Sequence, residues 1–333
     1  MLLYQKFLRP LFFQFDAETI HHVTMGTLER FGPAMAWFHR PPDARLARQV
    51  FGLTFPNPVG LAAGLDKNAV ALPAWEALGF GFVEVGTITA RPQPGNPKPR
   101  IFRVPECRAL VNRLGFNNDG CDRVAERLRH LRLKSLWPAI PVGINLGKSK
   151  VTPLEEAAND YLVSFERLRH LGDYFVLNVS SPNTPGLRSL QDRAQLDGLF
   201  RTIQAHNSDR QPLLVKIAPD LEWGPIEEVL ALAQEHGLAG IVATNTTVDH
   251  SSIPEARRTT GGLSGAPLRA RATEVVRFIT ARSPLPVIAV GGIMSADDAL
   301  EKFDAGAALV QLYTGFVYEG PGLVRRICEA LLR

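Results

Sequence analysis

Eight short apolar runs recur along this chain, and segments long enough for helices separate them. The runs cover residues 59–63, 82–86, 142–145, 175–179, 213–217, 240–244, 287–290 and 309–313. The segments between them carry apolar residues three and four positions apart and end at Gly or Ser, which is typical of amphipathic helices. Apolar strands that alternate with helices favour a parallel sheet covered on its outside, and eight strands close a (β/α)8 TIM barrel. An open, doubly wound sheet is the alternative architecture.

Length and composition agree with one barrel plus a small extra piece. The 333 residues are 45% hydrophobic and 21% charged, as in an ordinary globular protein. A net charge of +4, with arginines scattered among acids, suits an anionic ligand or an acidic membrane surface and does not favour nucleic acid. Cys107, Cys121 and Cys328 form no CxxC pattern, which indicates a reducing cytoplasm and neither a disulfide framework nor a zinc site.

The first 45 residues have a different texture from the rest. Polar and basic residues interrupt residues 1–15 too often for a membrane span, so the segment either lies on a membrane surface or docks on the main domain. Asp16 is a good N-cap for a helix that we expect to end near Gly32 and Pro33. We therefore divide the chain into a helical segment that is a candidate for a membrane role (1–45) and a barrel (46–333). The apolar residues of the 1–15 segment and of the helix after Asp16 are Leu2, Leu3, Phe7, Leu8, Leu11, Phe12, Phe15, Ile20, Val23, Leu28 and Phe31.

One segment breaks the alternation of strands and helices. Residues 90–118 contain five prolines and follow the second apolar run. A long insertion on the carboxyl side of a barrel strand is more often a functional loop than a spacer.

The carboxyl ends of the eight runs are the expected active-site edge of a barrel, and amides, hydroxyls, glycines and lysine dominate them. His250 alone among the histidines follows a run closely, and Asp66 and Asp220 are the remaining acids, so neither a catalytic triad nor a metal site is indicated. Asparagine side chains would match a neutral ring with alternating C=O and N–H edges, such as a pyrimidine imide, although any one of them could merely cap a turn. These asparagines are Asn112, Asn145, Asn178, Asn183 and Asn245.

Glycines after the last two runs indicate a phosphate-bearing ligand. Gly291 and Gly292 allow close backbone approach, Thr314 and Gly315 follow the eighth run, and residues 260–265 read as a further Gly-rich turn. Lys216 is expected to point into the barrel mouth. There it would either stabilise negative charge on a cofactor ring or form a structural ion pair with an interior acid such as Glu84.

These motifs together resemble the quinone-linked (class 2) dihydroorotate dehydrogenases over the whole chain. The resemblance is carried by GLAAGLDKN, VEVGTITARPQPGNPKPRIFR, NRLGFNNDG, GINLGKSK, NVSSPNTPGLR, VKIAPDL, IVATNTT, GGLSGAPL, VIAVGGI and VQLYTGF. It implies an FMN-dependent oxidation of dihydroorotate to orotate in pyrimidine biosynthesis, with electrons passed to a membrane quinone. It also implies a monomer bound peripherally at the cytoplasmic face of the cell membrane.

The resemblance also implies roles for individual residues. Ser181 looks like the general base, where class 1 enzymes use cysteine. Independently of the resemblance, strand or turn alternation predicts that Ser180 points away, and the SSPNT sequence suggests that Thr184 or an ordered water passes the proton on. Quinone access would involve the helical segment 1–45, whose apolar faces would line a passage together with His21, Arg103 and Tyr313. The family's FMN contacts fall on Ala63, Gly64, Lys67, Thr87, Asn145, Asn178, Lys216, Thr244, Gly265, Gly292, Tyr313 and Thr314. Its substrate contacts fall on Lys67, Asn112, Arg113, Leu114, Gly115, Phe116, Asn178, Asn183, Asn245 and Thr246.

Two other functions are compatible with the motifs taken singly. One is a different FMN barrel that acts on a dihydropyrimidine or dihydrouridine. The other is a phosphate-binding lyase or isomerase without flavin.

Overall fold

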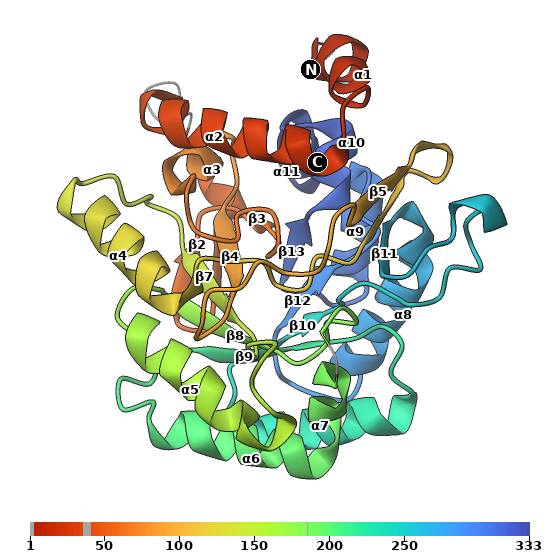
Figure 1. Cartoon of the computed structure of the whole chain (residues 1–333). Helices are drawn as coiled ribbons and strands as arrows, with labels where there is room; N and C mark the ends of the chain where they lie inside the picture. The colour runs from red at the N-terminus through yellow and green to blue at the C-terminus, as the bar shows by residue number, and fades with distance from the viewer. Residues whose placement is uncertain (1–2, 36–40, 185) are drawn as a thin grey trace.

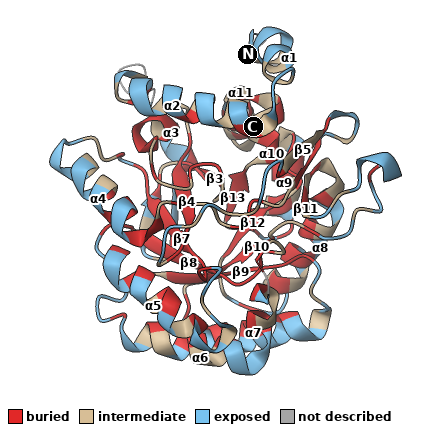
Figure 2. Cartoon of the chain, in the orientation of Figure 1, coloured by how far each residue is buried: buried red, intermediate tan, exposed pale blue. Residues whose placement is uncertain are grey.

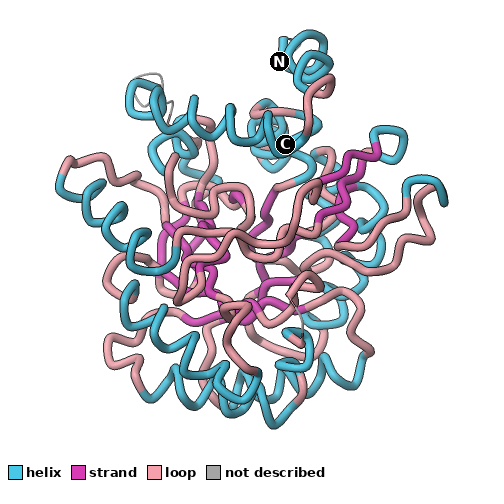
Figure 3. Tube along the Cα trace, in the orientation of Figure 1, coloured by secondary structure: helices cyan, strands magenta, loops and turns pink. Residues whose placement is uncertain are grey.

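The computed structural model describes residues 3–35, 41–184 and 186–333 of the chain. Its centre is a closed barrel in which each strand pairs in parallel with the next, and Val310 of the last strand lies opposite Val59 of the first. Figures 1 and 3 show these strands around the centre of the molecule. The (β/α)8 prediction is therefore confirmed, and the doubly wound sheet is wrong. The strands are β3 (Val59–Leu61), β4 (Phe82–Ile88), β7 (Val142–Leu146), β8 (Tyr174–Asn178), β9 (Leu213–Ile217), β10 (Gly240–Ala243), β12 (Val287–Val290) and β13 (Leu309–Leu312).

Helices cover the outside of the barrel, so the strands are buried on both faces (Figure 2). Their apolar stripes pack on the strands, as where the Phe165 ring meets that of Phe175 at 5.2 Å. The helices are α3 (Leu72–Ala77), α4 (Gly120–Leu133), α5 (Ala157–Leu168), α6 (Arg193–Ala205), α7 (Trp223–Glu235), α8 (Arg269–Thr280), α9 (Ala296–Asp304), α10 (Thr314–Glu319) and α11 (Gly322–Leu331). Short 3₁₀ turns are η3 (Ala44–Leu46), η4 (Pro105–Cys107), η5 (Leu154–Glu156), η6 (Leu187–Gln191), η7 (Glu255–Arg257) and η8 (Ala266–Leu268).

A hairpin that the apolar runs did not indicate closes the amino end of the barrel. It consists of β1 (Arg48–Val50) and β2 (Leu53–Phe55). Phe55 packs inside the barrel against Phe82, with ring centroids 5.2 Å apart, and belongs to the same apolar cluster as Tyr174. Because Phe82 and Tyr174 begin their strands, this plug fills the amino end and leaves open space at the carboxyl end.

A three-stranded antiparallel sheet covers part of the carboxyl end. The Pro-rich insertion supplies β5 (Ile101–Val104) and β6 (Ala109–Asn112), and β11 (Gly262–Gly265) joins β6. The prediction of a Gly-rich turn at 260–265 is therefore wrong, because pairing with a segment about 150 residues away in the chain makes it a strand. Glycine is still needed there, since a Cβ atom on Gly262 would lie 1.9 Å from Thr246 Oγ1.

The amino-terminal segment is helical, as expected. It contains a π-type turn η1 (Tyr4–Leu8), α1 (Arg9–Phe12) and α2 (Ala17–Met35), and α2 lies across the molecule beside α3 in Figure 1. The Asp16 carboxylate caps α2 by accepting the Thr19 N–H at 2.8 Å. Among the described residues, no helix is both long and apolar enough to cross a membrane.

The sequence predicted that this helix ends near Gly32 and Pro33, and in the structure α2 extends two residues further, to Met35. Gly32 packs closely on α3, where an added Cβ would lie 3.0 Å from the Cβ of Ala74. Pro33 sits in the last turn, where its missing N–H costs one hydrogen bond, and packing on α3 outweighs that local preference.

Candidate active site

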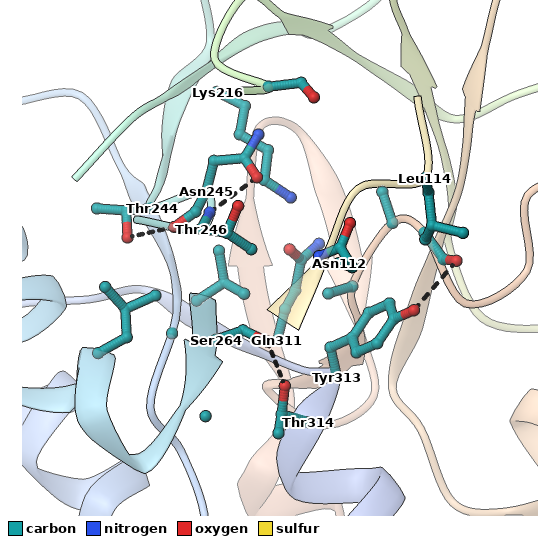
Figure 4. Close-up of a pocket in the computed structure, with 18 of the residues that line it drawn as sticks. Asn112, Leu114, Lys216, Thr244, Asn245, Thr246, Ser264, Gln311, Tyr313 and Thr314 are labelled. Atoms are coloured by element: carbon teal, nitrogen blue, oxygen red, sulfur yellow. Dashed lines mark hydrogen bonds between the residues drawn. The ribbon is translucent and has the colours of Figure 1, made fainter. Parts of the chain in front are cut away.

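The carboxyl end of the barrel contains a cavity of about 980 Å³. Ser181 and nearly all of the residues that the sequence assigned to cofactor or substrate line it, and they come from most of the barrel rim and from β6 and β11 (Figure 4). The structure brings together Ala63, Gly64, Lys67, Thr87, Asn112, Leu114, Gly115, Phe116, Asn178, Asn183, Lys216, Thr244, Asn245, Thr246, Gly265, Gly292, Tyr313 and Thr314.

Two assigned residues lie outside the cavity wall. Asn145 is buried one layer beneath it and accepts hydrogen bonds from Thr87 Oγ1 at 2.5 Å and Asn178 Nδ2 at 3.1 Å. The Arg113 side chain points away and donates to Thr260 Oγ1 at 2.8 Å and to the Pro99 carbonyl. Any contact of Arg113 with a ligand in this cavity would therefore involve its backbone.

The asparagines form two hydrogen-bonded groups, Asn145–Asn178–Asn245 and Asn112–Asn183, that orient their amide groups. Asn178 Nδ2 donates to Thr87 Oγ1 at 3.0 Å, and Asn245 Nδ2 donates to Asn178 Oδ1 at 3.2 Å. Asn183 Nδ2 donates to Asn112 Oδ1 at 3.3 Å. Because each amide is held by its neighbours, the polar edge that faces the cavity is preorganised for a neutral ligand.

The two neighbouring serines differ in what they face. Ser181 lines the cavity, and its Oγ accepts the Asn183 N–H at 3.2 Å. Ser180 Oγ instead donates to Asn178 Oδ1 at 3.1 Å and accepts from Asn245 Nδ2 at 2.9 Å. Thr184 Oγ1 is buried without a hydrogen-bond partner among the described residues.

Lys216 carries a buried positive charge at the floor of the cavity. Its ammonium has no hydrogen-bond or ion-pair partner among the described residues. The carboxylate of Glu84 instead accepts from Asn145 Nδ2 at 2.7 Å and Gln311 Nε2 at 2.6 Å. The predicted alternative, a structural ion pair between Lys216 and Glu84, is therefore wrong, because the two side chains make no direct contact. Burial lowers the pKa of Lys216, and the charge of Glu84 opposes that shift.

Glycines shape the opposite end of the cavity. Gly291 and Gly292 have φ angles of +121° and +76°, and a Cβ on Gly292 would lie 2.2 Å from the Arg269 Cα at the start of α8. The hydroxyls of Ser264 and Thr314 bond each other at 2.9 Å beside them. Gly291 and Gly292 line the cavity without side chains, and α8 begins beside them, so this end of the cavity suits a phosphate group.

Both acids at the strand ends have structural partners. Asp66 accepts from the backbone N–H groups of Val70 and Ala71 and from Trp75 Nε1 at 3.0 Å. Asp220 pairs with Arg188 at 2.8 Å.

A second cavity of about 1030 Å³ lies between the amino-terminal helices and the barrel. Mostly apolar side chains line it, together with all three residues assigned to quinone access, His21, Arg103 and Tyr313. Tyr313 lines both cavities, so the two spaces share a wall. Burial, followed by the charge of Lys67, lowers the pKa of His21 from 6.5 to about 3, so its imidazole is neutral at ordinary pH.

Replacing His21 with glutamine is expected to make the free energy of unfolding depend less steeply on pH below about pH 6.5. His21 stays neutral in the folded protein down to about pH 3, whereas the unfolded chain binds a proton there below about 6.5. Between these pH values the unfolded state binds one more proton than the folded state. The free energy of unfolding of the wild type therefore decreases as the pH is lowered, by up to about 1.4 kcal/mol per pH unit from this group. Urea unfolding at several pH values within this window measures the slope. The exposed His130→Gln variant is the control, and a His21→Gln slope equal to wild type contradicts the expectation.

Sequence reasoning missed several residues of the site. Gln311 lines the cavity from β13, and Arg188 holds the carbonyls of Ser180 and Thr246. A polar side chain at an inward position of a barrel strand was the available signal for Gln311. No local pattern marked Arg188, because its partners come from two separate loops.

Comparison with known proteins gives a consistent family. Residues 45–333 match the family model described as dihydroorotate dehydrogenase. The dihydroorotate dehydrogenase (quinone) of Gloeobacter violaceus is 55% identical over 97% of this chain and 92% of its own length. That of Chloroflexus aurantiacus is 51% identical over 99% and 96%.

Solved structures agree with the sequence relatives. The structure of DHODH from Eimeria tenella in complex with ferulenol is 38% identical, with a TM-score of 0.86 over 95% of this chain and 91% of its own. The ligand-free form of that protein gives a TM-score of 0.84 over 93% of each chain. These matches favour neither another flavin barrel nor a phosphate-binding lyase. This chain belongs to the dihydroorotate dehydrogenase family, and within it to the quinone-dependent class 2.

Proposed function

We propose that this protein oxidises dihydroorotate to orotate in pyrimidine biosynthesis, with FMN as its cofactor and a membrane quinone as the final electron acceptor. The observation that carries the proposal is the pair of cavities that share Tyr313 as a wall, one lined by amides and hydroxyls and the other largely apolar. A polar substrate and a hydrophobic electron acceptor can then reach one cofactor from the two different cavities.

The residues of the first cavity fit FMN on two counts. Gly265, Gly291 and Gly292 line the cavity without side chains and so leave the backbone accessible to a phosphate. The ammonium of Lys216, which has no partner among the described residues, matches an electron-rich ring. The flavin, when bound, supplies the two-electron acceptor that no protein side chain provides. Asn145, although outside the wall, would act by orienting Asn178 and Thr87.

Ser181 is the proposed base for the proton that lies α to a substrate carbonyl. As it takes this proton, its own hydroxyl proton is passed on to solvent, either through the Thr184 hydroxyl, which releases its own proton in turn, or through an ordered water, so no charge accumulates on the serine. Asn112, Asn183 and Asn245 hold the imide edge. The Nδ2 hydrogens of Asn112 and Asn183 that have no acceptor among the described residues stabilise the enolate character that develops.

The visible spectrum of the purified protein tests the function directly. A flavin band should bleach on anaerobic addition of dihydroorotate and return on addition of a soluble quinone. A colourless protein that FMN does not reconstitute would refute the cofactor. A yellow protein that dihydroorotate leaves unchanged would refute the substrate.

The amino-terminal helices are proposed to rest on the cytoplasmic face of the membrane, with the protein as a monomer. Leu3, Phe7, Leu8, Leu11 and Phe15 are exposed, with Lys6 and Arg9 among them, as in an interfacial segment, whereas Leu2 lies outside the described residues. Phe12 faces the apolar cavity.

Deleting residues 1–15 is expected to remove binding to anionic lipid vesicles and to lower turnover with a long-chain quinone, because this exposed apolar surface is lost. Bleaching by dihydroorotate should persist, since α2 remains. Vesicle flotation and separate half-reaction assays measure the two effects, with the same deletion assayed against a water-soluble quinone as the control. Undiminished vesicle binding by the shortened chain contradicts the membrane role.

A further inference from the structure

A buried ion pair joins the helix that lines the apolar cavity to the rim of the polar one. Glu18 on α2 is 3% exposed, and Arg100, just before β5, is 6% exposed. The Arg100 guanidinium donates Nε to both carboxylate oxygens of Glu18, at 3.1 and 3.0 Å, and Nη2 to Oε1 at 2.7 Å. Burial opposes ionisation of Glu18, yet the hydrogen bonds and charge of Arg100 leave its pKa below the ordinary value.

The other side of the same guanidinium holds the Pro-rich insertion in place. Arg100 Nη1 donates to the carbonyls of Pro94 at 2.6 Å and Asn96 at 2.8 Å. Gly95 between them has φ +78°, and a Cβ there would lie 2.6 Å from Arg100 Nη1. The loop is thus folded around Arg100, and its conformation depends on where Glu18 places that side chain.

Asn96 contacts both chain segments that supply the predicted substrate residues, 112–116 and the serine loop. Its Nδ2 donates to the carbonyl of Arg113 at 3.0 Å and to the carbonyl of Asn183 at 3.1 Å. Its backbone N–H bonds the Leu114 carbonyl at 3.0 Å. One side chain therefore ties the 112–116 segment to the serine loop, two residues from Ser181.

From this path we infer that Glu18 is a positioning residue for the dihydroorotate site, acting through Arg100 and Asn96 on the backbone of Asn183. The inference rests on the proposed function of that site. Glu18 itself lines neither cavity. Although it belongs to the helix that faces the quinone side, its effect falls on the pyrimidine side.

The test compares Glu18→Gln with Glu29→Gln, which makes the same change at an exposed position of the same helix. Glu18→Gln is expected to weaken orotate binding, read from the flavin absorbance shift, and to raise the KM for dihydroorotate, each about tenfold. The rate at which quinone oxidises the reduced flavin should stay within about twofold of wild type. Glu29→Gln should resemble wild type in all three measurements.

A second variant separates positioning from simple loss of stability. Asn96→Ala leaves α2 and the ion pair intact, and it should weaken orotate binding to a similar extent. If both residues act along one path, their effects should not add. The double variant Glu18→Gln/Asn96→Ala should then have about the same orotate affinity as the single variant that binds orotate less tightly. Additive losses, unchanged orotate affinity in Glu18→Gln, or equal slowing of both half-reactions would each overturn the inference.

A readout that needs no substrate distinguishes this inference from the proposed function. Hydrogen exchange of peptides covering residues 177–191 should accelerate in Glu18→Gln and not in Glu29→Gln. If dihydroorotate fails to bleach the wild-type flavin, the function is wrong, while the exchange comparison still decides whether Glu18 orders the serine loop.

Discussion

Replacing Ser181 with alanine is expected to slow flavin reduction by dihydroorotate about 10²- to 10⁴-fold, the usual contribution of a positioned general base. Ser181 Oγ is the hydroxyl that faces the cavity, whereas Ser180 Oγ is held by Asn178 and Asn245. Anaerobic stopped-flow measurement of flavin bleaching checks the rate.

Three comparisons make the serine prediction specific. Oxidation of the reduced flavin by quinone should be unchanged in Ser181→Ala, because that half-reaction takes no proton from the substrate carbon. Ser181→Cys should retain part of the rate, since a thiolate also accepts a proton. Thr184→Val should slow the same step if its hydroxyl passes the proton on. Full bleaching rates in Ser181→Ala rule out the serine as base.

Replacing Lys216 with methionine is expected to separate function from stability. The variant should reduce its flavin about 10²-fold more slowly and at a more negative potential, because the buried cation stabilises the electron-rich reduced ring. The flavin-free variant should nevertheless melt a few degrees higher, since a buried ammonium without a partner costs free energy that methionine does not. Dye-equilibrated potentials and thermal melts check the two effects.

Lys302→Met is the matched control for this variant. Lys302 is fully buried on α9, but its Nζ donates to Thr273 Oγ1 at 2.5 Å and to the Arg269 carbonyl at 3.0 Å. Its removal deletes both of these buried hydrogen bonds and should lower the melting temperature. A Lys216→Met protein with a wild-type flavin potential would show that this charge does not act on the cofactor.

Local pattern was enough to predict the barrel and most of its rim. Strand length, apolar continuity and helix spacing are short-range properties, and the rule that barrel sites lie at carboxyl strand ends then places side chains such as Asn178 and Lys216 together. The roles of these side chains came from resemblance to the dihydroorotate dehydrogenases, since amides and hydroxyls alone also serve as turn caps.

Long-range pairing decided what the sequence alone did not. The β11 strand exists because residues 262–265 meet β6, α2 passes Pro33 because it packs on α3, and Arg113 turns outward toward Thr260. The Glu18–Arg100 pair joins residues 82 positions apart, and neither carries a local signal. Periodicity and propensity act over a few residues, whereas the energy of a buried contact depends on which distant segment supplies the partner. The sequence by itself therefore determined the barrel and its polar rim, and the tertiary structure decided the three-stranded sheet over the carboxyl end, the second cavity and the Glu18–Arg100 contact between α2 and the Pro-rich insertion.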